Sequence, residues 1–412
     1  MKRPELLVPA GSPEVFRTAV VYGADAVYIG GEAFSLRAKA KNFSLEDMEE
    51  CIGFARERGV KVYVTANILA HDSDLDEAKE YFTQLGGMKN PPDGLIISDP
   101  GMFMLAKRHC PQIERHISTQ ANNTNSMTFN FWYEQGATRV VCARELSLEE
   151  IAVIRRSIPE DMEIEAFVHG AMCISYSGRC LLSAFLTGRE ANRGECTHPC
   201  RWNYALVEET RPGQYFPVFE NERGSYIFNS RDLCMIDHLP ELIEAGVDSL
   251  KIEGRMKTAL YVATVARTYR RAIDDLMKDR ALYEKNLPLY REEIKKCTYR
   301  QFTTGFFFGK PGSDAQIYDG NTYERGMIYL GCVEDVTGDG KVRITQKNKF
   351  LKGDSIEIMK PSGENVGTKV LAIENEEGEQ MESAPHASQT LYVTLDKEAV
   401  TGDILCCVNE EA

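Results

Sequence analysis

The stretch PELLVPAGSPEVFRTAVVYGADAVYIGG, residues 4–31, holds one complete strand–helix–strand unit. The apolar run LLVPA at residues 6–10 predicts a first buried strand, and AVYIGG at residues 26–31 predicts a second. Between them, Ser12 precedes Pro13 and Glu14, which is typical of a helix N-cap followed by proline at the first helical position. Strands alternating with helices in this way indicate repeated βα units.

The same alternation continues along the chain, giving eight predicted strands in all. The other six begin near Val60, Gly94, Glu114, Thr138, Glu163 and Ser249. Helices between them have recognisable starts, such as the capping-box patterns that begin at Ser44 and Ser147. Eight strands with intervening helices over about 250 residues are what a (β/α)8 TIM-like barrel requires. A doubly wound open sheet is the alternative, but no glycine-rich dinucleotide fingerprint follows the first strand.

Composition divides the chain into three parts. Residues 1–280 hold the predicted barrel, interrupted at residues 171–231 by a cysteine-rich insertion after the seventh strand. Residues 281–320 are a linking, partly helical segment, and residues 321–412 contain short alternating runs that indicate a small β-barrel domain. Because barrel enzymes keep their active sites at the carboxyl ends of the strands, the position of the insertion favours a functional role.

Charge and hydropathy limit the compartment and the partners. The 412 residues carry a net charge of −14, so a globally basic nucleic-acid footprint is absent, although local basic clusters can still meet phosphates. The sequence has no run of roughly eighteen apolar residues and no apolar signal-peptide core near its start. We therefore expect a cytoplasmic protein without a membrane partner, whose 12 cysteines are not joined in disulfides.

Four cysteines gather in the insertion with the spacing C-x6-C-x15-C-x3-C, namely Cys173, Cys180, Cys196 and Cys200. Only the last pair has the two to four intervening residues usual in structural zinc sites, so the spacing favours an iron–sulfur cluster over zinc. A nucleophilic cysteine served by His169 or His198 is a weaker alternative, because it leaves the other thiols unexplained. Cys234 is a possible substitute ligand, but its apolar neighbours favour a core position.

The motif EAFVHGAMC at residues 165–173, followed by SGRCLLS at residues 177–183, resembles the signature of peptidase family U32, the collagenase-like group. The similarity extends over most of the chain, including PELLVPAGSPE at the start, SLKIEGRMK at residues 249–257 and NKFLKGDSIEIM at residues 348–359. Within that family, CTHPCRW at residues 196–202 looks most like a branch that hydroxylates tRNA.

This resemblance implies a tRNA-modifying enzyme that converts the anticodon wobble uridine to 5-hydroxyuridine. It implies a 4Fe–4S cluster with Cys200, rather than Cys234, as the fourth ligand, and prephenate as a cosubstrate. Peptidase activity has little chemical support, because the sequence contains no HExxH zinc motif, no GxSxG elbow and no assignable Ser/His/Asp set. A collagenase-like peptidase and a non-catalytic RNA-binding protein with a structural metal site are the alternatives.

Substrate contacts are expected where the barrel strands end. The predicted contact residues are Arg37, Lys39, Asn67, Gln120, Asn122, Arg144, Lys251, Glu253 and Arg255. Among them, Arg37, Arg144 and Arg255 are our choices for a small dicarboxylate such as prephenate, because a guanidinium binds a carboxylate in bidentate fashion.

Two residues of the seventh strand are predicted to be catalytic. His169, at the end of that strand, is expected to move a proton during hydroxylation, and Glu165 is assigned a catalytic role beside it. For RNA, Arg300, Phe302 and the run at residues 306–308 offer cationic and stacking surfaces, with aromatic packing between domains as the alternative.

Overall fold

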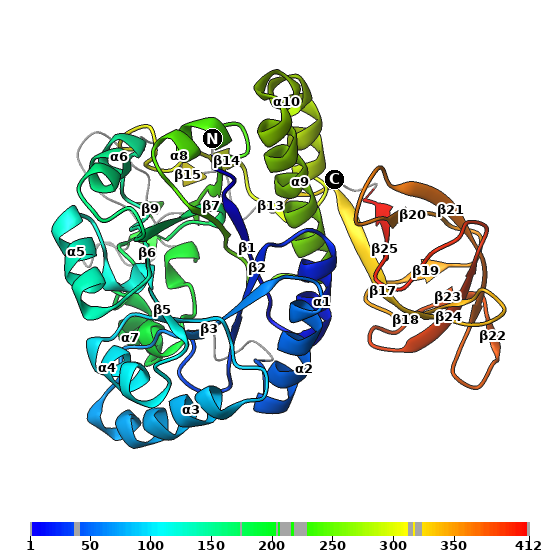
Figure 1. Ribbon diagram of the computed structural model, residues 1–412. Coiled ribbons are helices and arrows are strands. Elements are labelled where there is room, and N and C mark those ends of the chain that lie inside the picture. Colours follow the sequence, from blue (N-terminus) through cyan, green and yellow to red (C-terminus); the bar gives the residue numbers. More distant parts are fainter. Residues whose placement is uncertain are drawn as a thin grey trace.

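The computed structural model describes residues 2–36, 42–173, 175–202, 205–206, 216–217, 229–311, 316–317 and 324–409. Its first part is a closed parallel barrel ringed by helices, which confirms the predicted (β/α)8 fold (Figure 1). The barrel strands lie where the sequence predicts them: β1 (Glu5–Pro9), β2 (Ala26–Gly30), β3 (Lys61–Ala66), β4 (Gly94–Ile97), β5 (Glu114–Ile117), β6 (Arg139–Val141), β7 (Glu163–Ala171) and β12 (Ser249–Ile252). Parallel pairing of β12 with both β7 and β1 closes the ring.

Capping side chains fix where the outer helices begin. Ser12 accepts a hydrogen bond from the backbone N–H of Val15, and the capping boxes predicted from Ser44 and Ser147 both form. The helices that cover the barrel are α1 (Pro13–Val21), α2 (Leu45–Arg56), α3 (Leu75–Gly87), α4 (Pro100–His109), α5 (Ser126–Gln135), α6 (Leu148–Arg156), α8 (Leu239–Glu244) and α9 (Ala259–Lys278).

The insertion leaves and re-enters the barrel at one place. After β7 the chain returns as β11 (Asp232–Cys234), which pairs with β7 in antiparallel register, Ala171 facing Asp232. The described elements between them are α7 (Leu182–Thr187), the short 3-10 helices η3 (Ala191–Arg193) and η4 (Pro199–Arg201), and the strands β8 (Ala205–Leu206), β9 (Phe216–Pro217) and β10 (Asn229–Ser230). The insertion is therefore held at the carboxyl end of β7.

Helix α10 (Arg280–Ile294) packs against α9 and leads to the C-terminal domain through β13 (Thr298–Tyr299), β14 (Phe302–Thr303), β15 (Gln316–Ile317) and β16 (Glu324–Arg325). That domain consists of β17 (Met327–Val336), β18 (Val342–Thr345), β19 (Phe350–Leu351), β20 (Ser355–Met359), β21 (Val366–Glu374), β22 (Gln380–Met381), β23 (Ser383–Ala384), β24 (Thr390–Leu395) and β25 (Ile404–Val408). Strand β20 pairs with both β25 and β21, so the antiparallel sheet closes on itself and confirms the predicted all-β domain (Figure 1).

The C-terminal domain is bound to the first barrel by specific contacts. Tyr22 on the barrel side donates its hydroxyl to the carbonyl of Met359 at 2.7 Å, and Lys347 pairs with Glu14 at 2.8 Å. The buried apolar core of the barrel continues into this interface. Among the helices of the described residues, none has the length and apolarity needed to cross a membrane.

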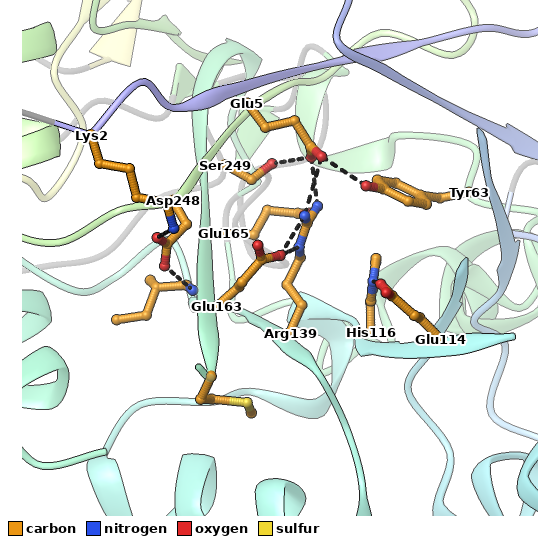
Figure 2. A network of polar contacts seen from close by, with 12 residues as sticks. Lys2, Glu5, Tyr63, Glu114, His116, Arg139, Glu163, Glu165, Asp248 and Ser249 are labelled. Atoms are coloured by element: carbon orange, nitrogen blue, oxygen red, sulfur yellow. Dashed lines mark hydrogen bonds and ion pairs between the residues drawn. The ribbon is translucent and has the colours of Figure 1, made fainter. Parts of the chain in front are cut away.

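The amino-terminal end of the barrel is filled by a network of buried charges (Figure 2). The guanidinium of Arg139, at the start of β6, is 2% exposed and lies 2.6 Å from Glu5 and 2.6 Å from Glu163. Tyr63 and Ser249 donate their hydroxyls to Glu5 at 2.7 and 2.8 Å. Burial alone raises the pKa of Glu5, but Arg139 and these hydrogen bonds outweigh it and lower that pKa from 4.5 to about 2.

Glu165 connects this floor with the middle of the barrel. One of its carboxylate oxygens lies 3.2 Å from Arg139, and the other accepts the ammonium of Lys251 at 2.6 Å. Both the carboxylate and the ammonium are buried, so each requires its partner. The result is a chain of alternating charges from the floor of the barrel to the cavity described below.

We expect Arg139→Ala to be strongly destabilising, because it leaves three carboxylates at the closed end of the barrel without their shared cation. Breaking a buried ion pair from one side costs about 3–5 kcal/mol. Urea denaturation followed by circular dichroism measures the change. The control is Arg17→Ala, which removes an exposed pair with Glu50 and should cost less than about 1 kcal/mol. Equal losses in the two variants would contradict the role given to Arg139.

The lowered pKa of Glu5 predicts how stability depends on acid. A carboxyl whose pKa is lower in the folded protein contributes its full stabilisation above its unfolded pKa of 4.5 and loses it as pH falls toward the folded value of about 2. We therefore expect Glu5→Gln to lower the free energy of unfolding at neutral pH and to make its decline between those two pH values shallower. Denaturation at a series of pH values tests this, and an unchanged slope would count against it.

Candidate active site at the carboxyl end of the barrel

Two adjoining cavities lie at the open end of the barrel. The first, of about 90 Å³, is inside the barrel, and the second, of about 450 Å³, lies under the cysteine-rich insertion. They share a wall made of Thr119, Gln120, Arg144, Ser177, Glu253 and Arg255. A molecule that reaches this wall therefore contacts the same six side chains from either cavity.

Most of the predicted contact residues meet in the barrel cavity. Its lining includes Asn67, Gln120, Arg144, Lys251, Glu253 and Arg255. Asn122 does not line it, because this residue adopts a left-handed backbone conformation and its amide donates to the carbonyl of Gln120 at 2.9 Å. Arg37 and Lys39 lie outside the described residues. Sequence reasoning missed the hydroxyl groups of Thr65, Ser118 and Thr119, which carry no motif and are recognised only by their position at strand ends.

Three cations and one carboxylate face the barrel cavity. Lys251 is held by Glu165 and lies 4.6 Å from the ring centroid of Tyr28, a cation–π distance. Arg144 pairs with Glu253 at 3.3 Å and donates to the carbonyl of Ala171 at 2.7 Å. The excess of positive charge in a small enclosed space suits an anionic ligand.

Arg255 is placed by a close approach of the backbone. Its guanidinium donates to Ser35, to Thr65 at 3.2 Å and to Asn42 at 2.9 Å. A Cβ on Gly30 would overlap this guanidinium, so only glycine leaves room for it at the end of β2. The position of Arg255 therefore explains why residue 30, the first glycine of YIGG, has no side chain.

The two residues predicted to be catalytic lie elsewhere. Glu165 is below the cavity and contacts it only through Lys251. The His169 ring packs against Tyr261, Tyr269 and Phe302, with ring centroids 5.6 to 6.1 Å away. Burial lowers the pKa of His169 to about 4, so the ring is neutral near pH 7. The structure does not bring this ring into either cavity.

The four cysteines of the insertion surround the second cavity. Cys173, Cys180, Cys196 and Cys200 all line it, and no disulfide joins cysteines within the described residues. Cys234 does not line it. This residue lies on β11 with its sulfur 4.0 Å from the Tyr269 hydroxyl, and burial raises its pKa to about 12.

The donor set can be tested against zinc and against an iron–sulfur cluster. A structural zinc draws four ligands to about 2.0–2.3 Å from one ion. Within the part of the chain that the structure describes, no three His, Cys, Asp or Glu side chains are grouped closely enough to hold a metal ion. An iron–sulfur cluster takes thiolate ligands, and the four cysteines that line this cavity supply that donor set. The residues present therefore fit such a cluster.

Hydrogen bonds tie the insertion to the barrel rim. Ser177 donates to the side-chain oxygen of Gln120 at 3.3 Å, and Arg193 pairs with Asp74 at 2.8 Å. Gly178 has a φ of 76°, and a Cβ there would lie 2.7 Å from the same Gln120 oxygen. The SGRC sequence therefore requires glycine for both conformation and space.

The aromatic surface predicted for RNA is mostly internal. Arg300 is 1% exposed and pairs with Asp232 at 2.9 Å. Phe302 stacks on Tyr299 with ring centroids 4.8 Å apart, and Phe307 is buried. Internal packing, the alternative, describes Arg300, Phe302 and Phe307, whereas Phe308 is 55% exposed.

The structure combines three features: a TIM-like barrel, a cysteine-lined cavity at the carboxyl end of its strands, and a small β-barrel domain that follows it in the chain. Together they define a class of proteins. The chain belongs to peptidase family U32. The family model "Peptidase family U32" matches residues 11–317, and "Peptidase family U32 C-terminal domain" matches residues 325–405. The resemblance seen in the sequence is confirmed.

Curated relatives carry names that refer to RNA hydroxylation. The chain is 40% identical to "tRNA hydroxylation protein P1" of Bacillus subtilis, over 98% of this chain and 94% of that protein. It is 39% identical to "tRNA hydroxylation protein P" of Escherichia coli, over 97% of this chain and 95% of that protein. It is also 40% identical to the Escherichia coli "23S rRNA 5-hydroxycytidine C2501 synthase", over 68% of this chain and 40% of that protein.

Proposed function

We propose that this protein is a tRNA-modifying enzyme that hydroxylates the anticodon wobble uridine to 5-hydroxyuridine, using an iron–sulfur cluster and a small dicarboxylate such as prephenate. The observation that carries the proposal is the shared wall between the cysteine-lined cavity and the cation-lined barrel cavity. The names of full-length relatives support RNA hydroxylation as the reaction.

Cys173, Cys180, Cys196 and Cys200 would hold a 4Fe–4S cluster, whose irons supply redox or Lewis-acid chemistry next to the bound substrate. The wall residues would then lie between the cluster and the barrel cavity. Thr119, Gln120 and Ser177 offer neutral hydrogen-bonding groups there, which suit the edges of a base rather than a phosphate.

The barrel cavity would take a carboxylate end of the cosubstrate. Lys251 lies on the cavity lining with Glu165 behind it, and Arg144 and Arg255 stand at the wall. Because the two cavities share a wall, a molecule bound in the barrel cavity can extend past that wall toward the cysteines. His169 has no part in this proposal, since its ring packs among aromatic side chains. In the same scheme Glu165 orients Lys251.

A peptidase finds little support in the same geometry. Among the described residues, no histidine lines the barrel cavity, and the histidine that lines the cysteine cavity, His198, stands in sequence between Cys196 and Cys200, two of the proposed cluster ligands. Purified protein is expected to leave gelatin intact.

The deciding measurement is nucleoside mass spectrometry of tRNA from a deletion strain. We expect 5-hydroxyuridine and its derivatives to disappear and to return when the wild-type gene is supplied. Complementation with Lys251→Met should restore less than about a tenth of the product, since losing one charge-assisted contact costs about 1.5–3 kcal/mol. The variant also leaves the buried Glu165 with Arg139 as its remaining ionic partner, so thermal denaturation is measured beside it. Unchanged 5-hydroxyuridine in the deletion strain, with no second enzyme present, would rule the proposal out.

Cysteine substitutions test the cluster separately from the reaction. After anaerobic purification, Cys173→Ser, Cys180→Ser, Cys196→Ser and Cys200→Ser should each lose most iron and acid-labile sulfide. Cys234→Ser is the matched control and should keep both, because its thiol does not line the cavity. Iron content and visible absorption are measured, with thermal denaturation to confirm folding. A colourless wild-type protein that contains zinc would contradict this assignment.

A further inference from the structure

The protein is acidic, but its charges are unevenly distributed. Residues 325–409, the C-terminal domain, contain nine Lys and Arg against fourteen Asp and Glu. Residues 171–202, around the cysteines, contain four Arg against two Glu. Beside them, the 251–257 stretch adds Lys251, Arg255 and Lys257 against Glu253. Two carboxylates outside these stretches, Glu165 and Asp74, pair with Lys251 and Arg193, and a positive excess remains after both are counted. A polyanion is therefore attracted to the cysteine-rich end of the barrel and repelled by the C-terminal domain.

The helix that covers this end has its apolar side outward. In α7, the polar Ser183 is 1% exposed, whereas Phe185 is 85% exposed. Leu181 and Leu186 are also exposed. The hydroxyl of Ser183 accepts the backbone N–H of Thr197 at 3.1 Å, which fixes the helix against the segment that carries Cys196. An amphipathic helix in a globular protein turns its apolar side to the core, so the opposite orientation marks a contact surface.

Two further aromatic side chains of the insertion are exposed, at positions close to the cysteines in sequence. Trp202 is 47% exposed and follows η4, which packs against α7. Tyr176 is exposed and lines the cysteine cavity itself. We call Tyr176, Leu181, Phe185, Leu186 and Trp202 the insertion face. Two exposed guanidinium side chains, Arg179 and Arg189, belong to the same segment.

We infer that the insertion face binds unpaired bases of a single-stranded RNA loop by stacking, while Arg179 and Arg189 contact its phosphates. This inference rests on the proposed function and names the surface that function needs. Chemistry on a base requires it to be unstacked and turned into a pocket, and the neighbouring bases then need new stacking partners. Aromatic side chains at the edge of the cysteine cavity supply those partners.

Charge favours RNA over a protein partner for this surface. Exposed apolar side chains alone suit either, but here they are combined with a local excess of arginine in a chain of net charge −14. An RNA loop bound there also brings a base to the mouth of the cavity that Tyr176 lines.

The test measures binding of the full-length protein, purified anaerobically, to a fluorescently labelled tRNA anticodon stem–loop. Phe185→Ala and Trp202→Ala should each weaken binding about 5-fold or more, since stacking of one base contributes about 1–3 kcal/mol. Binding of a fully paired duplex of the same length should change little. Arg179→Gln should make the plot of log affinity against log salt concentration shallower, with a slope smaller by about one.

The matched control is Phe131→Ala. Phe131 lies on α5 and is 51% exposed, close to the exposure of Trp202, but it is remote in sequence from the insertion. This variant should bind the stem–loop as the wild type does. Iron content and melting temperature of all variants should match the wild type, because the substituted side chains are exposed.

Each outcome decides one question. Wild-type affinity of Phe185→Ala and Trp202→Ala for the stem–loop would overturn the inference, and loss of a co-purifying protein instead would assign the face to a protein partner. If the face governs loop binding but the deletion strain keeps its 5-hydroxyuridine, the RNA surface stands and the proposed hydroxylation falls.

Discussion

A single buried guanidinium, that of Arg139, joins the strands at the closed end of the barrel. It lies on β6 and contacts carboxylates of β1 and β7, and Glu5 in turn accepts hydroxyls from β3 and β12. Because Arg139 and Glu165 are removed from water, each is tolerated only with its partners in place. The network closes one end of the barrel and passes through Glu165 to Lys251, so it also determines where a positive charge meets the cavity.

Local signals explain why so much of the fold could be predicted from the sequence. Strands of β-branched residues and serine-capped helices depend on neighbours within a few residues, and all eight barrel strands and both capping boxes are observed. Six of the contact residues predicted from strand ends line the barrel cavity, because parallel strands end at the same side of a barrel. The gathering of four cysteines also follows from their presence on one insertion.

His169 shows where sequence reasoning fails. Strict alternation from the inward-facing Glu165 would place His169 inside the barrel as well. The register between β7 and β12 shifts after the pair of Phe167 and Lys251, so that His169 faces Ile252 and its ring turns outward to α9. A β-bulge of this kind inverts the facing of every later residue on a strand. The RNA-binding surface predicted around Phe302 depended on these side chains being exposed. Exposure is set by tertiary packing rather than by residue type, so the sequence could not show that Phe302 stacks on Tyr299 and that Phe307 is buried.

The pairing of Ala171 with Asp232 has a consequence for assembly and divergence. Residues 172–231 connect two strands that pair in the β7–β11 ladder, so the entropy of bringing the two ends of this segment together is offset by strand pairing in the barrel. Whatever the loop binds does not have to hold its ends together. The barrel strands can therefore pair before the insertion binds any ligand. Length and sequence within the insertion can also change between relatives while the register of the barrel stays the same.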